Sequence, residues 1–178
     1  KSLTLVDLTV DWSDRADAGL RGSSAGGMLV EVGVNRDDGE GGLLLRRVIA
    51  DEGTGDWSAD FSEPGNLPDE QNTAEAIWDG AYGWVSAIDE DGDRTQLDWS
   101  IPNPHMDVWI SNNFISVYDW PAGTVLTITV MQGETELYST TRTLENDGQD
   151  LPGSEEFPLA PGQTVTISGG GFERSLTL

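Results

Sequence analysis

Short runs in which apolar and polar residues alternate recur along the whole chain, and this pattern predicts β-strands. Residues 3–10 read Leu-Thr-Leu-Val-Asp-Leu-Thr-Val, and Asp56–Phe61 place three apolar side chains on one side of an extended backbone. The same pattern predicts further strands at residues 28–34, 43–50, 82–88, 94–101, 106–110, 114–118, 125–131, 136–144, 163–168 and 172–178. The one helical candidate, Asp69–Trp78, is equally consistent with a long surface loop. The chain is therefore expected to be all-β.

Two prolines in Ile101-Pro102-Asn103-Pro104 mark the best boundary between two domains. Proline interrupts a strand ladder, and two of them stiffen a short extended link. We therefore predict one domain at residues 1–103 and a second at residues 104–178. The first is expected to carry an insertion, either a loop or a short helix, near residues 62–80.

The two halves resemble each other in the order of their features. Residues 25–32, in which a small residue and a glycine lead into an apolar strand, line up with residues 122–129. Residues 83–88 line up in the same way with residues 162–167, and each half then has a glycine-bearing turn, an arginine and a last strand. This order predicts two consecutive antiparallel β-sandwiches of similar topology.

The chain ends almost as it begins. Lys1-Ser2-Leu3-Thr4-Leu5 returns as Arg174-Ser175-Leu176-Thr177-Leu178, an offset of 174 − 1 = 173 residues. One interpretation is a single period cut from a tandem array, since repeated units that contact mainly their neighbours build long objects. The alternative is coincidence, because serine, leucine and threonine are all common residues.

Charge excludes several classes of partner. The chain has 32 acidic and 9 basic residues, for a net charge of −23. Such a surface repels nucleic acid and anionic membranes. High salt, a calcium-rich exterior and the solubility of a repeat array are all consistent with this acidity. No apolar run reaches the ~20 residues of a membrane-spanning helix, so no membrane insertion is expected.

Several turn-and-strand motifs resemble the tandem immunoglobulin-like repeats of large prokaryotic secreted or cell-surface proteins. They are Ala25-Gly26 before a strand, Asp56–Phe61, Asp89–Asp93, Asp119–Val125 and Pro161–Thr166. The resemblance implies immunoglobulin-like sandwiches, an extracellular or cell-surface location, and a structural or adhesive role. It carries over no catalytic residue. Residues 66–80 have no counterpart in the usual short repeat and are a candidate for a specialised contact.

One acidic turn is a candidate calcium site. Asp89, Asp91 and Asp93 are spaced two residues apart around Gly92, and Asp98 follows. Three such carboxylates can place hard oxygen ligands on one cation, with Asp98 or a backbone carbonyl completing the shell. The alternative is a solvated hairpin turn, since aspartate and glycine favour turns for their own reasons. No other cofactor is expected.

The chain has seven tryptophans and no cysteine. Trp57, Trp84 and Trp99 lie in alternating strand patterns and are expected in the core, whereas Trp78 and Trp120 adjoin turn signals and are candidate contact residues. Because His105 is the single histidine and adjoins the proline link, no catalytic triad is indicated, and we expect no enzyme.

The leading functional hypothesis is a structural repeat of an extracellular filament, stalk or surface layer. Its partners would be copies of itself or adjacent repeats, held by end-to-end packing and by edge pairing of strands 1–10 and 172–178. The alternative is an adhesive or glycan-binding module, which predicts a row of exposed aromatic residues or a pocket near residues 62–80. A hydrolase, the third alternative, would need convergent acids in a cleft.

Overall fold

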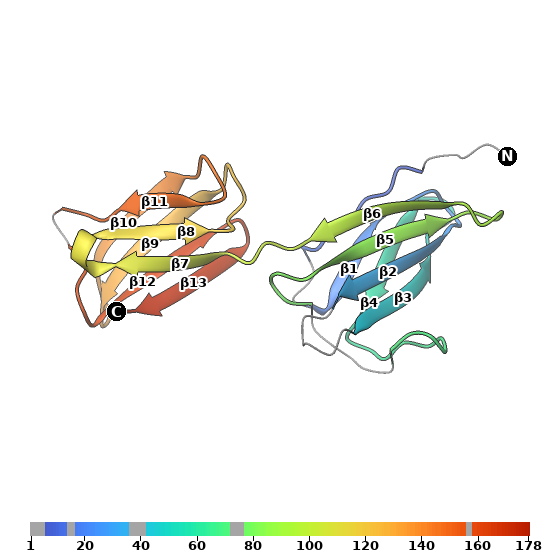
Figure 1. Cartoon of the computed structure of the whole chain (residues 1–178), viewed down its shortest axis with the longest axis horizontal. Coiled ribbons are helices and arrows are strands. Elements are labelled where there is room, and N and C mark those ends of the chain that lie inside the picture. The colour runs from blue at the N-terminus through green and yellow to red at the C-terminus, as the bar shows by residue number, and fades with distance from the viewer. Residues whose placement is uncertain (1–5, 14–16, 36–41, 72–76, 156–157) are drawn as a thin grey trace. The chain divides into compact units, whose positions relative to one another are not determined.

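The computed structural model describes residues 6–13, 17–35, 42–71, 77–155 and 158–178. Contacts divide the chain into two compact units, Lys1–Ile101 (unit 1) and Pro102–Leu178 (unit 2), each a body of packed strands in Figure 1. Over the described ranges the elements are β-strands and a short 3-10 turn, η2 (Ile110–Asn112). No helix in these ranges has the length and apolar content needed to cross a membrane.

Unit 1 is a sandwich of two antiparallel sheets. Its strands are β1 (Gly19–Ser23), β2 (Leu29–Asn35), β3 (Leu43–Ile49), β4 (Asp56–Asp60), β5 (Tyr82–Ile88) and β6 (Arg94–Ser100). One sheet has the order β3-β2-β5-β6, and the other pairs β1 with β4. The segment before β1 extends this pair, because the Thr9 N–H donates to the Ser23 carbonyl over 3.0 Å and Asp11 bridges to Arg21.

Unit 2 is a second sandwich. Its strands are β7 (His105–Trp109), β8 (Phe114–Tyr118), β9 (Val125–Gln132), β10 (Thr135–Thr143), β11 (Gln149–Pro152), β12 (Gln163–Gly169) and β13 (Phe172–Thr177). A four-stranded sheet, β10-β9-β12-β13, packs against a three-stranded sheet, β11-β8-β7. Both are antiparallel, and four strands on three is an arrangement of immunoglobulin-like sandwiches.

The two units share one topology. Adding seven to the strand numbers of β3-β2-β5-β6 gives β10-β9-β12-β13, and β1-β4 becomes the neighbouring pair β8-β11. The sequence correctly matched β2 with β9 and β5 with β12. The prediction of two consecutive β-sandwiches of similar topology is confirmed.

The cores follow from strand alternation. In unit 1, Leu20 of β1 and Trp57 of β4 face Val32 of β2 and Val85 of β5, and all four side chains are buried. The core of unit 2 is built in the same way from alternate positions, namely Ile115, Val117, Leu126, Ile128, Val130, Leu151, Val165 and Ile167. Most outward positions on the same strands are polar or aromatic, although Val125 is an aliphatic exception at 58% exposure. Function therefore has to be sought on the outer faces, edges and loops.

The longest connection of unit 1 lies between β4 and β5. Its counterpart in unit 2, between β11 and β12, is shorter. Residues 69–71 and 77–78 are turns or irregular, and the rest of the helical candidate Asp69–Trp78 lies outside the described residues. We call residues 62–71 the edge strap.

Candidate functional site

The edge strap closes the outer edge of β3. An edge strand leaves a row of N–H and C=O groups open to pairing with another chain. Here the Leu45 N–H donates to the Gln71 Oε1 over 2.5 Å, and the Arg47 N–H donates to the Glu70 Oε1 over 2.7 Å. Two side chains therefore take the place that the backbone of a further strand would occupy.

Glu70 also folds the strap itself. Its second carboxylate oxygen accepts hydrogen bonds from the Asn66 N–H (2.7 Å) and the Leu67 N–H (3.0 Å). The Gly65 N–H donates to the Gln71 carbonyl over 2.9 Å. A single carboxylate thus joins the strap's turn to β3.

Arg46 fastens the strap from the inner side of β3, where it is only 6% exposed. Its guanidinium donates to the carbonyls of Asp60 (3.2 Å), Leu45 (2.7 Å) and Glu63 (2.7 Å). It also lies 5.0 Å from the centroid of the Phe61 ring, within the range of a cation–π contact. One side chain therefore connects β3 with the end of β4 and the start of the strap.

An ion network lies on the outer side of the four-stranded sheet and connects β2, β3 and β6. The carboxylate of the buried Glu31 pairs with Arg47 and with Arg94, each over 2.7 Å, and Arg47 also pairs with Asp69 of the strap. The hydrogen bond from Arg47 lowers the pKa of Asp69. This pair therefore helps to hold the strap at neutral pH, and its contribution is lost as pH falls through the lowered pKa.

The acidic turn between β5 and β6 gathers three of its predicted ligands. Oxygens of Asp89, Asp91 and Asp93 lie within 4.8 Å of one another. The Asp89 Oδ1 accepts hydrogen bonds from the Asp91 N–H (3.2 Å) and the Asp93 N–H (2.8 Å), so Asp89 has a role in the turn that needs no cation.

Asp98 does not join this cluster, which corrects the proposed ligand set. It lies further along β6, opposite Trp84, and accepts a hydrogen bond from the Gln96 side chain over 3.0 Å. Because β6 leads away from the turn, the spacing that looked favourable in the sequence separates Asp98 from the other three.

Calcium binding at this turn stays a prediction. Millimolar calcium is expected to raise the unfolding midpoint, since an ion at 100 times its Kd adds about 2.7 kcal/mol of stability. The double variant Asp91→Asn/Asp93→Asn should lose the response, whereas Asp98→Asn should keep it. Thermal unfolding with calcium, magnesium or chelator measures this. A midpoint that does not change with calcium would assign the three carboxylates to the turn alone.

The tryptophans divide differently from the prediction. Trp57 and Trp99 are buried, as expected, but Trp84 is half-buried on the outer face of β5. The prediction that Trp120 is a contact residue is wrong, because its side chain is 0% exposed and packs edge-on against Phe172 at 6.2 Å. Trp78 is half-buried in the loop before β5, and its contact role stays a prediction.

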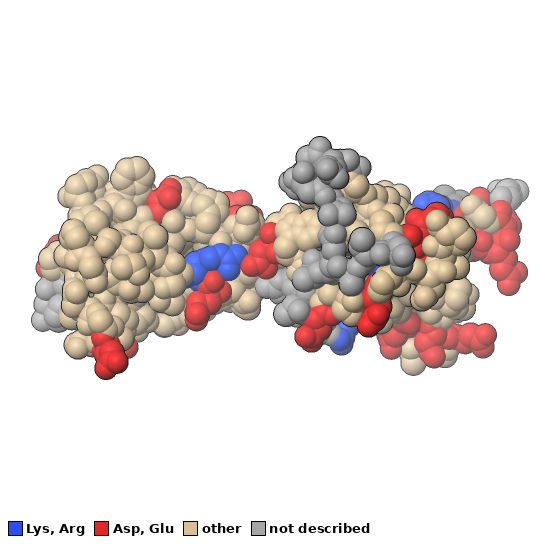
Figure 2. Space-filling model, turned by 90° about the horizontal axis from the view of Figure 1, so that it is seen from below, with Lys and Arg blue, Asp and Glu red and all other residues tan. Residues whose placement is uncertain are grey.

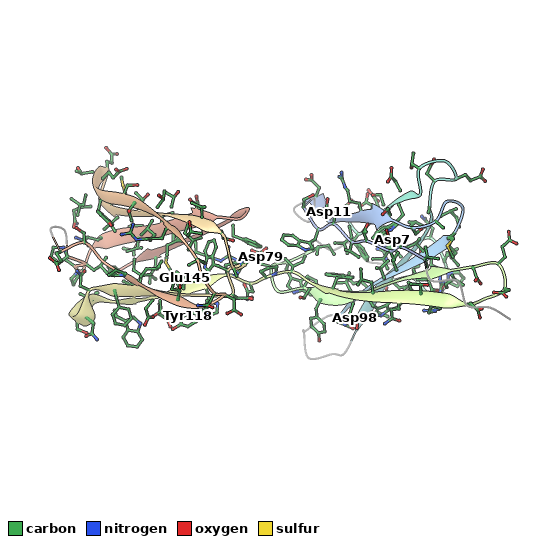
Figure 3. The ribbon with its side chains drawn as sticks, turned by 90° about the horizontal axis from the view of Figure 1, so that it is seen from above. Asp7, Asp11, Asp79, Asp98, Tyr118 and Glu145 are labelled. Carbon is green, nitrogen blue, oxygen red and sulfur yellow. The ribbon has the colours of Figure 1, made fainter. Side chains whose placement is uncertain are left out.

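Two aromatic pairs on unit 2 were missed. His105 stacks on Tyr118 with centroids 5.0 Å apart, and Trp109 stacks on Phe114 at 5.8 Å. All four lie on the outer side of β7 and β8, where Tyr118 is labelled in Figure 3. The outward alternation of His105, Asp107 and Trp109 was the signal that identifies this face.

One end of unit 1 is apolar. Val6, Met28, Leu29, Ile49 and Ile88 line an open hollow of about 720 Å³, together with residues of the neighbouring turns. Ile49 is 62% exposed. We call these five residues the apolar pole. It lies at the end of β6 opposite Ile101, because Ile88 pairs with Arg94 at the start of that strand.

Acidic side chains are spread over the described surface. In Figure 2 they are most frequent on unit 1, whereas the visible face of unit 2 is broadly uncharged. The few basic side chains include Arg46, Arg47 and Arg94, which are engaged in the contacts above. The surface seen in Figure 2 therefore offers no basic patch for a polyanion.

Comparisons with known proteins give little. No protein-family model matches the chain, and no curated protein matches it. Among solved structures it is similar to a chain described as "Biofilm associated protein - BSP domain", at 13% identity and a TM-score of 0.32. The match covers 97% of this chain and 29% of that one. Likeness at this level establishes neither a shared fold nor a shared role.

Proposed function

We propose that the chain is a structural repeat unit of an extracellular or cell-surface assembly, such as a filament, stalk or surface layer. The observation that carries the proposal is one strand topology used twice in succession. The recurrence of Ser-Leu-Thr-Leu at an offset of 173 residues supports it, because it is the spacing of a two-sandwich period. The second copy of this tetrapeptide begins in β13 and the first lies outside the described residues.

The apolar pole supports end-to-end packing. The pole combines the exposed Ile49 with four half-buried apolar side chains. A contiguous apolar surface on an otherwise charged protein marks a contact surface. The pole includes Val6, which lies in the segment that leads into unit 1, and a preceding unit is the partner that this position favours. Neighbouring copies or adjacent repeats are therefore the proposed partners. We propose neither a nucleic-acid partner nor an enzymatic activity.

The strap limits which sheet edges can pair with a strand of a neighbouring copy. At β3 it occupies the groups that an incoming strand would need, whereas β13 is the last strand in its sheet and carries the repeated tetrapeptide. Edge-strand pairing in the assembly is thus proposed at β13 and at the segment before β1, and not at β3.

A tandem of two copies tests the proposal. We would join them so that the Ser-Leu-Thr-Leu shared by adjacent copies occurs once at the junction. The second copy is expected to unfold at a higher temperature than an isolated copy, because its apolar pole is covered. Hydrogen exchange at Met28, Leu29 and Ile49 should slow, and longer concatemers should form extended particles in electron micrographs.

The matched control is Ile49→Asp in the second copy. Because Ile49 is exposed, this change should leave an isolated copy within about 0.5 kcal/mol of wild type. It should nevertheless remove the gain in the tandem. Tandem copies that unfold and exchange as independent single copies would contradict the repeat proposal.

A glycan-binding or adhesive module is the second candidate function. Exposed aromatic residues on the outer faces of both units favour it, namely Tyr82 on unit 1 and Tyr118 on unit 2. Aromatic rings on a solvated face can stack against the apolar face of a sugar, and the two candidates differ in whether the partner is another copy or a saccharide.

A further inference from the structure

The outer face of the four-stranded sheet of unit 1 holds an open hollow of about 500 Å³. Its lining comes from the ends of β2, β5 and β6 that lie far from the acidic turn. The residues are Asn35, Tyr82, Gly83, Trp84, Asp98, Trp99 and Ser100. This size and this mixture of aromatic rings with a few polar groups are typical of small-ligand sites.

Gly33 allows the Trp84 ring to lie against the sheet. A Cβ at position 33 would come within 2.6 Å of the Trp84 Cε2, 2.7 Å of its Nε1 and 3.0 Å of its Cζ2. Three ring atoms so close to one backbone point mean that the indole lies across the strand and is not directed outward. Only glycine leaves room for this, so β2 and β5 together fix the ring.

Arg94 holds the same ring from another direction. Its guanidinium lies 5.9 Å from the centroid of the Trp84 ring and pairs with Glu31 over 2.7 Å. The indole is therefore positioned before any ligand arrives, which lowers the entropy cost of binding.

Polar groups surround this platform on the same face. Asp98 is the cross-strand partner of Trp84, while Asn35 and Ser100 are the partners of Tyr82, and such pairs share a face. Asp98 is labelled in Figure 3 on the outer side of the β6 ribbon. Tyr82 is 44% exposed. A carboxylate, an amide and two hydroxyls thus flank one fixed ring.

We propose that this hollow binds a neutral saccharide. The apolar C–H face of a pyranose stacks on an aromatic ring, and its adjacent hydroxyls donate to a carboxylate and exchange hydrogen bonds with an amide. A net charge of −23 disfavours anionic glycans. An apolar protein surface is disfavoured as well, since it would bury the Asp98 carboxylate with no donor beyond the Gln96 side chain. The inference rests on the second candidate function and identifies its ligand class and site.

Unit 2 gives an internal comparison. At the centre of its equivalent sheet face, Thr166 and Thr164 form hydroxyl contacts of 3.0 Å each with Ser175 and Thr177. The outward positions of β9 and β12 carry no aromatic residue. The platform is therefore particular to unit 1, although the two sheets share one topology.

The test is binding of the whole chain to an array of neutral gluco-, manno- and galacto-oligosaccharides, with sialylated and sulfated glycans beside them. Wild type is expected to bind neutral glycans. Trp84→Ala should abolish the signal, and Asp98→Asn, which keeps the shape, should weaken binding about tenfold by removing the charged acceptor. The matched control Trp109→Ala removes an exposed tryptophan of unit 2 and should bind like wild type.

The other outcomes distinguish the Trp84 hollow as the binding site from glycan binding elsewhere on the chain. Binding that survives Trp84→Ala but is lost in Trp109→Ala would overturn this site and leave glycan binding standing. A preference for sialylated or sulfated glycans would overturn the neutral ligand class. If wild type binds nothing on the array, both the site and the glycan function fall, while the structural-repeat proposal is unaffected. Unfolding curves of each variant confirm that the sandwich is intact.

Discussion

Replacing Trp120 with alanine is expected to lower the free energy of unfolding of unit 2 by about 3–5 kcal/mol, the usual cost of removing a large buried aromatic side chain. The ring is 0% exposed and meets Phe172 at an interplanar angle of 80°. Asp119, just before it, has a left-handed φ of 56°, and the Trp120 N–H donates to the Asp147 carbonyl over 3.2 Å. The backbone therefore directs this side chain inward, and the variant leaves a cavity.

The measurement is hydrogen exchange of unit 2 within the intact chain, because two units need not unfold in one step. Amides of β9 and β12 should exchange faster in Trp120→Ala, while those of unit 1 stay unchanged. Trp109→Ala is the control: this tryptophan is 47% exposed, and its loss should cost less than about 1 kcal/mol. Equal, small effects of the two changes would mean that Trp120 is not a core residue.

Alternation identified most of the strands because a sandwich exposes one face and buries the other. The strands β1 and β11 were missed. Gly19–Ser23 contains two glycines, and Gln149–Pro152 contains an aspartate and a proline, so neither has local β-propensity. They form because β4 and β8 offer them pairing partners, which lie far away in the sequence.

The internal alignment found the right strands with the wrong register. It set Val32 against Thr129, yet Val32 lies in the core while Thr129 makes a hydroxyl contact with Ser139 on the outer face. A slip of one residue exchanges the two faces of a strand. Similar turns identified the corresponding strands in the two units. Only the buried positions show which side chains of each strand face the core and which face solvent.

The candidate sites, too, could be predicted only where their residues are close together in the sequence. Asp89, Asp91 and Asp93 are local, so the sequence could place them together. The strap and the Trp84 hollow depend on contacts across distant segments. Gly33 and Gln71 carry no signal of their own, and their roles arise from packing against Trp84 and β3.

Replacing Arg46 with alanine is expected to cost about 2–4 kcal/mol, because carbonyls in a mostly buried setting lose a charged donor at about 1–3 kcal/mol each, part of it recovered by water. The affected acceptors are the carbonyls of Asp60, Leu45 and Glu63, and the Phe61 ring loses its cation. The change should also release the strap, since Arg46 connects its first residues to β3.

Hydrogen exchange reports strap release directly. The amides of Leu45 and Arg47, which donate to Gln71 and Glu70, should exchange faster in Arg46→Ala than those of β5. Light scattering should show more self-association, because the edge of β3 becomes open to pairing. Arg46→Lys is the matched control: it keeps the charge but not the planar fork, so its effect should be intermediate. If the Leu45 and Arg47 amides remain protected in Arg46→Ala, the strap docks without this arginine, and the closed edge of β3 depends on Glu70 and Gln71 alone.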